Sequence, residues 1–253
     1  MLQHERHRRI VAIAEADGRV TVLEAAATLG VAAETIRRDL SALQHEGLIR
    51  RVHGGAVPID QQRYEPLVHK REHVRVEEKT RIARAALDEL PESGVLIIDA
   101  GSTPRRFAEV LPVDRRFTVV TNSLPVAAAL VEKPNLDVII TGGTVKRDTL
   151  AVVDFESVAS IVERLADIAF LGCDGMTSGR GLTTHARDEA RVKEAMIRSS
   201  RRAVLLADHS KYGNEQFATF AKLEEIDTII SDTGLSDDAV ADLESGGTLV
   251  VRA

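Results

Sequence analysis

The sequence predicts an α/β protein in which a small helical domain precedes a larger domain built on a mostly parallel sheet. Helical periodicity interrupted by glycine fills residues 4–57, whereas apolar runs and helical stretches alternate from Gly94 onward. The balance of basic and acidic residues also differs between the N-terminal and C-terminal parts of the chain. Residues 1–84 carry 15 Lys and Arg against 12 Asp and Glu, and residues 85–253 carry 18 against 27. We therefore expect a domain over 1–57, a linker over 58–78 and a second domain over 79–253.

The composition indicates a globular protein of the cytoplasm. With 44% hydrophobic and 28% charged residues, a chain of 253 residues can bury a substantial core. No apolar run approaches the roughly 18 residues of a membrane helix, and the polar start MLQHERHRR lacks a signal-peptide core. The single Cys173 excludes an intramolecular disulfide. We expect a cytoplasmic chain with no membrane partner.

Glycines separate the first three predicted helices. The first is expected from about His4 to Ala16, because Asp17-Gly18 breaks its pattern. Thr21 and Glu24 have the spacing of a capping box, which predicts a second helix over Val22–Leu29. Gly30 then supplies a tight turn before the third helix. Helix, short turn and helix is the helix-turn-helix arrangement, whose second helix enters the DNA major groove.

The third helix, within residues 31–48, has one apolar and one polar face. Ile36, Leu40 and Leu43 fall at helical spacing and predict a buried stripe, and Gly47 stands where a helix-ending glycine belongs. The opposite face carries side chains suited to hydrogen bonding with base edges and phosphates: Thr35, Arg37, Arg38, Ser41 and Gln44.

A cationic hairpin is predicted directly after this helix. Arg50, Arg51 and His53 alternate along an extended segment, and Gly54-Gly55 would let the backbone approach a phosphate closely. This is the pattern of a DNA-binding wing. The alternative, a plain three-helix bundle with solvated surface arginines, has no need of such a hairpin.

The predicted linker, residues 58–78, is polar, rich in charge and contains two prolines. An exposed connector is expected, and packing against a partner subunit is the alternative. Lys79 then begins a helix, with Ile82, Ala86 and Leu90 facing inward.

From Gly94 the pattern predicts a mostly parallel sheet covered by helices on both faces. Strands are expected at Val95–Asp99, Thr118–Thr121, Leu136–Thr141, Ile168–Leu171, Ala203–Ala207 and Thr228–Ile230, and helices at Pro104–Leu111, Ser123–Val131, Ser157–Leu165, Ala186–Ser199 and Ser236–Glu244. Because ligands bind at the carboxyl ends of strands in such sheets, the residues after each strand are candidate site residues.

Small polar residues recur at these strand ends and predict a pocket for a polar ligand. Amides and hydroxyls at helix N-termini suit a phosphate, and a carboxylate and a cation could bind sugar hydroxyls and a phosphate. A single loop of this kind is more often ordinary turn chemistry, but five in succession favour a site. The candidate residues are Asp99, Gly101, Ser102, Thr103, Asn122, Ser123, Gly142, Gly143, Asp174 and Lys211.

No catalytic residue, metal ligand or cofactor motif is predicted. The sequence has no G-x-x-x-x-G-K-[ST] and no G-x-G-x-x-G opening a helix. His185 and His209 are expected to be isolated structural or rim residues, and Cys173, after a buried strand, to be a small hydrophobe.

Several segments resemble the DeoR/GlpR family of bacterial transcriptional regulators. TIRRDL (35–40) and EGLIRRVHGGA (46–56) resemble its DNA-binding signature, and DAGST, VVTNS, ITGGTV, FLGCDGM, GLTT and LLADHSKYG follow in the family's order. The resemblance implies a winged helix-turn-helix domain and a sensor domain, similar to ribose-5-phosphate isomerase, that senses phosphorylated sugars. Three positions depart from the family pattern: Ala32 for serine, Pro104 for a hydroxyl residue and Asp154 for glycine.

The resemblance implies a repressor that binds operator DNA as a homodimer or homotetramer and responds to a phosphorylated sugar effector. The alternative is a sugar-phosphate isomerase or deaminase carrying a DNA-binding domain, with Asp174 as general base and Lys211 as electrostatic stabiliser. Against it, only one carboxylate lies in that strand-end motif, where Gly175 occupies the next position. A structural DNA-packaging protein is disfavoured because the larger domain is acidic.

Overall fold

The computed structural model describes residues 3–17, 19–52, 54–58 and 68–253, and the chain divides into two compact units, Met1–Glu65 and Pro66–Ala253. Each unit has hydrophobic core clusters of its own. Across the described residues, no helix combines the length and apolar character that a membrane span requires.

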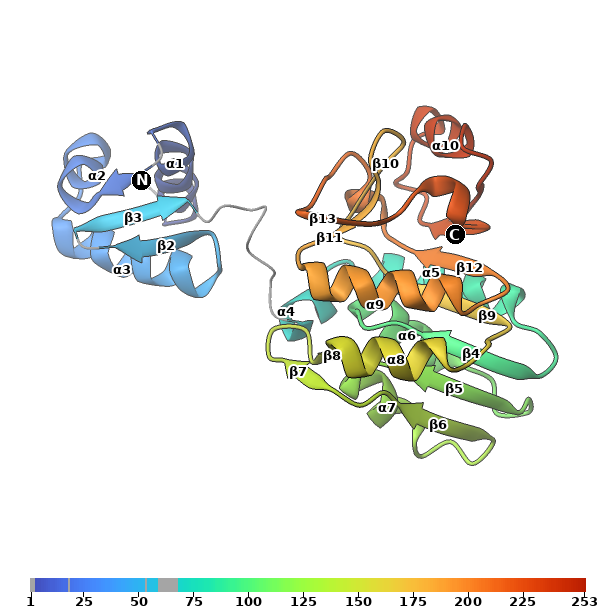
Figure 1. The fold of residues 1–253 in the computed structure, drawn as a ribbon. Helices are drawn as coiled ribbons and strands as arrows, with labels where there is room; N and C mark the ends of the chain where they lie inside the picture. The colour runs from blue at the N-terminus through green and yellow to red at the C-terminus, as the bar shows by residue number, and fades with distance from the viewer. Residues whose placement is uncertain (1–2, 18, 53, 59–67) are drawn as a thin grey trace. The chain divides into compact units, whose positions relative to one another are not determined.

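The first unit packs three helices against a small antiparallel sheet (Figure 1). The predicted stripe of Ile36, Leu40 and Leu43 is fully buried with Ile10 and Ile49. The predicted helices and hairpin are therefore confirmed, and a short strand before the second helix completes a sheet of order β1-β3-β2. In chain order the elements are α1 (Gln3–Asp17), β1 (Val20–Thr21), α2 (Val22–Leu29), α3 (Ala33–His45), β2 (Ile49–Val52) and β3 (Gly55–Pro58).

Helices α2 and α3 begin and end as the sequence predicts, with one difference. The Glu24 amide donates to Thr21 Oγ1 at 3.2 Å, but the Glu24 carboxylate accepts from the Thr21 hydroxyl at 2.6 Å, not from the Thr21 amide. Gly30 and Gly47 both have left-handed backbone, with φ of 65° and 74°. After α3, the amides of Gly47 and Leu48 donate to the carbonyls of Gln44 and Leu43, which is a Schellman end.

The second unit is built on a seven-stranded, fully parallel sheet of order β15-β14-β12-β9-β4-β5-β6. The strands are β4 (Gly94–Ile98), β5 (Phe117–Thr121), β6 (Leu136–Ile140), β9 (Ile168–Leu171), β12 (Ala203–Leu206), β14 (Thr228–Ser231) and β15 (Leu249–Arg252). Alternate side chains of β4 enter different cores, Ile97 on one face and Leu96 and Ile98 on the other. This confirms the predicted sheet with two covered faces.

Helices cover both faces of this sheet. On one face lie α5 (Val76–Ala85), α6 (Ser102–Val110) and α7 (Leu124–Leu130), whose apolar residues share a core with Leu96 and Ile98. On the other lie α8 (Phe155–Val162), α9 (Arg187–Arg198) and α10 (Asp237–Glu244). Three-residue to four-residue 3₁₀ turns follow at Ala86–Glu89, His209–Lys211 and Leu223–Glu225.

Five short strands outside the main sheet were not predicted. They are β7 (Thr144–Lys146) with β8 (Ala151–Val153), and β10 (Gly175–Thr177), β11 (Gly181–Thr184) and β13 (Ala218–Ala221). All are antiparallel, and β11 coincides with a segment predicted to be a strand-end loop, residues 181–184. Runs of three or four residues carry too little periodicity to distinguish a strand from a loop.

The linker is shorter than its predicted range of 58–78, because two helices occupy its second part. Val68 is buried at the start of α4 (Val68–Glu72), and its amide donates to the Asp148 carbonyl at 2.7 Å. Helix α5 begins at Val76, earlier than the predicted Lys79. The charged composition hid this start because α4 is short and only Val68 on it is buried among the described side chains.

Candidate DNA-binding surface and effector site

Helix α3 presents the predicted polar face to solvent. Arg37, Arg38 and Ser41 are exposed and Thr35 is half-buried. Arg37 pairs with Glu34 at 3.0 Å, whereas Arg38 makes no hydrogen bond or ion pair with the described residues. Arg38 is therefore the most available cation on this face.

Hydrogen bonds fix the hairpin to α3. Arg51 donates from Nη1 to Ser41 Oγ at 3.0 Å and from its amide to Gln44 Oε1 at 2.9 Å. Ser41 in turn donates to the Arg37 carbonyl at 2.9 Å. Ser41 and Arg51, both predicted DNA contacts, thus also position the wing. The other predicted wing contacts, the Arg50 side chain and His53, lie outside the described residues.

The two glycines of the wing have different surroundings, and those of Gly55 differ from the prediction. Gly54 has a φ of 78° and open space around it. At Gly55, however, an added Cβ would lie 2.1 Å from the Val20 carbonyl oxygen, because β3 pairs directly with β1. Packing within the unit therefore requires Gly55, and the predicted close approach to a phosphate is left to Gly54.

Asp39, in the middle of α3, was not singled out from the sequence. It is buried and accepts hydrogen bonds from Arg6 at 2.5 and 3.0 Å and from His7 at 3.1 Å. Burial raises the pKa of Asp39, but the bonds from Arg6 and His7 outweigh it and hold that pKa below its ordinary value. Its position on the edge of the apolar stripe was the only sequence signal.

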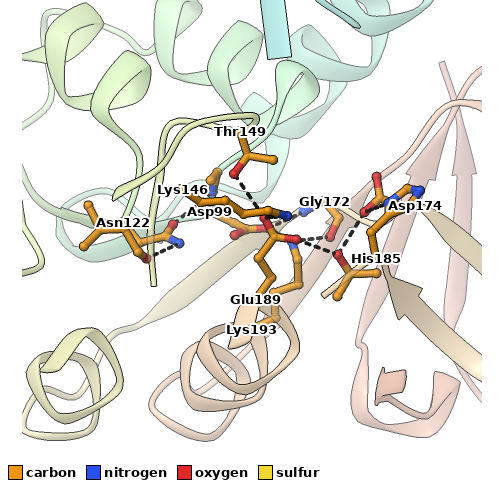
Figure 2. A network of polar contacts seen from close by, with 12 residues as sticks. Asp99, Asn122, Lys146, Thr149, Gly172, Asp174, His185, Glu189 and Lys193 are labelled. Carbon is orange, nitrogen blue, oxygen red and sulfur yellow. Dashed lines mark hydrogen bonds and ion pairs between the residues drawn. The ribbon is translucent and has the colours of Figure 1, made fainter. Parts of the chain in front are cut away.

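In the second unit, the ends of β4, β5 and β9 meet in a polar network (Figure 2). Asp99 follows β4, is fully buried, and accepts from the Gly172 amide at 3.0 Å and from Lys193 of α9. Lys193 also donates to the Gly172 carbonyl at 3.0 Å. Burial lowers the pKa of Lys193, but Asp99 more than offsets this and leaves that pKa above its ordinary value. Asp99 is therefore a structural anchor of the site.

Asn122 and Ser123 also serve the framework. The Asn122 side chain accepts from the Ala100 amide at 3.0 Å and donates to the Val152 carbonyl at 3.2 Å, and so joins three loops. Ser123 accepts from the Val126 amide at 3.3 Å and caps α7. Both residues were predicted for the site, and the structure brings them to it as supports.

Asp174, after β9, is the most strongly stabilised carboxylate of the site. Arg71 of α4 donates to it at 3.0 Å, the Thr184 hydroxyl at 2.9 Å, and His185 Nδ1 lies 3.1 Å away. Burial raises the pKa of Asp174, but His185, Arg71 and Lys211 outweigh burial and hold that pKa far below its usual range. The prediction that His185 is isolated was wrong.

A second carboxylate, Glu189, was missed because it lies on α9 and not in a strand-end motif. It is buried and accepts from Thr149 at 3.0 Å and from Lys146 at 3.1 Å. The Thr184 hydroxyl lies within hydrogen-bonding distance of both Glu189, at 3.2 Å, and Asp174. Figure 2 shows these side chains facing one another across the loops. The strand-end motif itself holds only Asp174, as predicted, and the second carboxylate of the network comes from α9.

Other predicted residues have groups left over for a ligand. The Ser102 and Thr103 hydroxyls, at the start of α6, and the Lys211 ammonium make no hydrogen bond with the described residues. Gly101 caps α6, and Gly142 is exposed. The Ser102 and Thr103 hydroxyls and the Lys211 ammonium are therefore the donors of the predicted set that make no bond with the described residues.

Further cations come from the predicted linker and from Lys79, the first residue after it. Arg75 lies 3.7 Å from Asp208, and Lys79 donates to the carbonyls of Arg71 and Val74 at 2.7 Å each. Burial, reinforced by the charges of Lys211 and of nearby arginines against the opposing effect of Asp208, lowers the pKa of Lys79 to about 8. Positive charge is therefore concentrated beside Lys211.

The three departures from the family pattern have structural consequences. Ala32, the N-cap of α3, makes no side-chain cap bond, as predicted. Pro104 is buried in the first turn of α6, where proline is tolerated. Asp154 has a φ of 111°, a backbone suited to glycine, but its carboxylate accepts from the amides of Thr144, Glu156 and Ser157 and so joins β7 to the start of α8.

Three residues considered for other chemistry have defined surroundings. Burial raises the pKa of the Cys173 thiol to about 12, so Cys173 behaves as an unreactive hydrophobe. His209, expected to be isolated, has Nδ1 2.7 Å from Asp232, and that prediction was wrong. The described residues contain no group of three or more His, Cys, Asp and Glu that could hold a metal ion.

Comparison with known proteins identifies the family. The DeoR-like helix-turn-helix domain model matches residues 6–62, and the DeoR C terminal sensor domain model matches residues 74–233, more than half of the chain. The chain belongs to the DeoR family of transcriptional regulators. This DeoR-family chain is therefore a DNA-binding regulator, with its winged domain in the first unit and its sensor domain in the second.

Relatives align over almost the whole regulator. It is 43% identical to the HTH-type transcriptional regulator GlpR of Haloferax volcanii, over 99% of this chain and 98% of that protein. It is 32% identical to the glycerol-3-phosphate regulon repressor of Escherichia coli, over 92% of both. Ribose 5-phosphate isomerase A from Methanocaldococcus jannaschii shows a partial likeness, with 16% identity, a TM-score of 0.41 and coverage of 54% of each chain.

Proposed function

We propose that this regulator represses a carbohydrate catabolic operon and that a phosphorylated sugar, or a metabolite derived from one, changes its operator binding. The names of relatives support the pathway class: one is a glycerol-3-phosphate regulon repressor, and another, 36% identical, is the L-fucose operon activator of Haemophilus influenzae. We propose repression and not activation because the first of these relatives is named as a repressor.

On the DNA side, the exposed face of α3 and the wing form the proposed contact surface. Arg38, with no partner among the described residues, is proposed to contact a base or phosphate from the groove-facing side, with Arg37 and Thr35 beside it. Arg51 and Ser41 set the angle between wing and helix through their 3.0 Å bond. Arg50 and His53 remain proposed phosphate contacts.

On the effector side, the supporting observation is that some polar groups of the network are bonded within the protein and others are not. The buried carboxylates and amides are satisfied within the protein, whereas Ser102, Thr103 and Lys211 have unused donors at the same edge of the sheet. Hydroxyls, helix N-terminal amides and an ammonium are the groups that bind phosphate. Asp174 and Glu189 would accept from sugar hydroxyls, and Gly142 and Gly143 would form the rim.

We also propose that the regulator is not an enzyme. The second carboxylate, Glu189, gives the isomerase alternative a group that the sequence did not reveal. A general base needs a pKa near the working pH, however, and the pKa of Asp174 lies far below its usual range. Glu189 accepts hydrogen bonds from Lys146 and Thr149, so its contacts are those of a framework residue.

The test is an electrophoretic mobility shift of the DNA upstream of the regulator's own gene, titrated with a panel of sugar phosphates and glycerol 3-phosphate. We expect salt-sensitive binding that one compound weakens by about 5- to 150-fold, the usual range of allosteric coupling. Lys211→Ala should lose most of this response while keeping DNA affinity. Lys222→Ala, which removes an exposed lysine paired with the exposed Glu224, is the matched control.

The experiment tests three parts of the proposal separately: the effector, the absence of enzymatic activity and the position of the site. If no compound changes DNA binding, the effector assignment fails although the regulator stands. If the purified protein converts the active compound to product, the non-enzyme assignment fails. If Lys222→Ala and Lys211→Ala lose the response equally, the site is not at this edge of the sheet.

A further inference from the structure

Helix α4, the first described element after the wing, is held on the second unit mainly by polar contacts. Arg71 donates to Asp174 at 3.0 Å, with 17% of the Arg71 side chain and 8% of the Asp174 side chain exposed. At the start of the helix, the Val68 amide donates to the Asp148 carbonyl at 2.7 Å. Val68 is also the only buried side chain among those described on α4. A short helix with so few apolar contacts opens locally at low cost, so its position depends on these polar contacts.

Both of these contacts lead to the same two carboxylates of the proposed effector site. The turn that accepts the first amide of α4 joins β7 to β8. Lys146 and Thr149 of the same hairpin donate to Glu189, at 3.1 and 3.0 Å (Figure 2). The Thr184 hydroxyl then links Glu189, at 3.2 Å, to Asp174, at 2.9 Å. A closed chain of contacts therefore runs from the start of α4 through the hairpin and both carboxylates back to α4.

A third contact joins α4 to the helix whose first turn carries the two unbonded hydroxyls of the proposed site. Glu72 of α4 pairs with Arg105 of α6. The charge of Lys211, the other donor without a bond to the described residues, also acts on Asp174, so Lys211 lies near the Arg71 contact. A phosphate bound by these donors therefore comes close to the Arg71 guanidinium, whose planar fork of N–H groups matches phosphate and carboxylate alike.

We infer that the effector reaches the DNA-binding unit by releasing α4, because its phosphate takes the Arg71 guanidinium from Asp174. Asp174 is then available to the sugar hydroxyls that the proposed function assigns to it. Among the described elements, α4 follows β3 of the wing directly, so its release changes where the chain that leads from the wing is first held on the second unit. The inference rests on the proposed function, since it names how occupancy of that site alters operator binding.

Lys79 and Arg75 provide the point about which α4 can turn. Lys79 is buried in α5 and donates to the carbonyls of Arg71 and Val74 at 2.7 Å each, so the end of α4 stays on the unit when its side-chain contacts break. Arg75 lies between the two helices with a left-handed backbone, φ 51° and ψ 50°, which is uncommon for a residue other than glycine. Such residues cluster in segments that switch between two arrangements. Release therefore moves the first described hold on the second unit from Val68 to the Arg71 carbonyl.

Hydrogen exchange and operator binding of the ligand-free full chain test the inference. Arg71→Ala makes the break that the ligand is inferred to make, so it should speed exchange in α4 by about 10-fold and weaken operator binding by about 5-fold or more. Thr149 makes no bond with the described groups of α4, so Thr149→Val should speed exchange in α4 only through the hairpin and Glu189. Arg71→Lys keeps a cation near Asp174 and should have a smaller effect than Arg71→Ala.

Arg84→Ala removes an exposed arginine of α5 and is the matched control, which should leave both measurements unchanged. Unchanged exchange in β4 and β9 shows that each variant keeps its fold. Arg71→Ala with wild-type exchange in α4 overturns the inference. Faster exchange in α4 without weaker operator binding also overturns it, because α4 then opens without controlling the DNA-binding unit.

The sugar phosphate that changes operator binding gives the second arm of the test. At saturation it should speed exchange in α4 of the wild type to the rate of Arg71→Ala, and it should change neither exchange in α4 nor operator binding of Arg71→Ala. An active compound that slows exchange in α4, or that weakens operator binding of Arg71→Ala as much as that of the wild type, overturns the inference and leaves the proposed function intact. If no compound is active while Arg71→Ala weakens operator binding, the effector assignment fails and the control by α4 stands.

Discussion

At the scale of single residues, the structure separates side chains that bind from side chains that hold the binders in place. Asp39 is the sharpest case in the first unit. It stands among the candidate DNA-contacting residues of α3, yet it points inward to Arg6 and His7 of α1. Its side chain is 4% exposed and that of Arg6 is 12% exposed, and removal of the carboxylate leaves Arg6 with no partner among the described residues.

We expect Asp39→Asn to destabilise the first unit by about 3 kcal/mol, the lower end for breaking a buried ion pair. Because folding lowers the pKa of Asp39, its contribution is complete above the ordinary value of 3.8 and is lost as the pH falls through the lower folded value. Urea unfolding of wild type and variant between pH 7 and pH 2 should therefore show a stability difference that disappears only in acid. Glu34→Gln, at an exposed pair on the same helix, should cost less than about 0.5 kcal/mol. A difference that persists unchanged at pH 2 would contradict this account.

At the scale of elements, helix α3 starts without a side-chain cap. Ala32 has an extended backbone, with φ of −65° and ψ of 144°, which is the conformation of a capping residue. Among the described residues, the Thr35 amide bonds to the Ala32 carbonyl, at 2.9 Å. The Gly30 turn and the Arg51 bonds to α3 therefore carry more of the positioning of this helix.

Ala32→Ser should stabilise α3 by about 1 kcal/mol, because a hydroxyl in this backbone conformation can accept from the free amides of the first turn. Hydrogen exchange of the amides from Glu34 to Ile36 should slow by about 5-fold, and operator affinity should rise. Ala33→Ser, the same change one residue later, cannot cap and serves as the control. Equal effects of the two substitutions would show that capping is not the cause.

Most helices and six of the seven main strands could be predicted from their apolar patterns, such as Ile36, Leu40 and Leu43, whereas β15 and α4 were missed. The residues at the strand ends could also be predicted, because locating a strand also locates the residues that follow it. What escaped prediction depends on long-range packing. Lys193 and Glu189 sit on α9 at ordinary helical spacing, and nothing in their neighbourhood in sequence indicates that they face Asp99 and Asp174, which lie far away along the chain.

At the scale of the whole molecule, the two units have separate hydrophobic cores, and the polar groups of the proposed effector site lie in the second. The first unit carries 9 Lys and Arg against 9 Asp and Glu, whereas the second is acidic, with 24 against 30. Local stability should therefore respond to each ligand separately, since a ligand stabilises the unit whose folded form it binds.

Hydrogen exchange measured by mass spectrometry tests this separation on the full chain. The active sugar phosphate, at 100 times its dissociation constant, should stabilise the second unit by up to about 2.7 kcal/mol and slow exchange in β4, β9 and α9. Operator DNA should instead slow exchange in α3 and in the wing. Lys211→Ala should remove the first effect and keep the second, whereas Arg38→Ala should weaken the second and keep the first. Equal slowing of both units by either ligand alone would mean that they unfold as one cooperative body, which would contradict the separation.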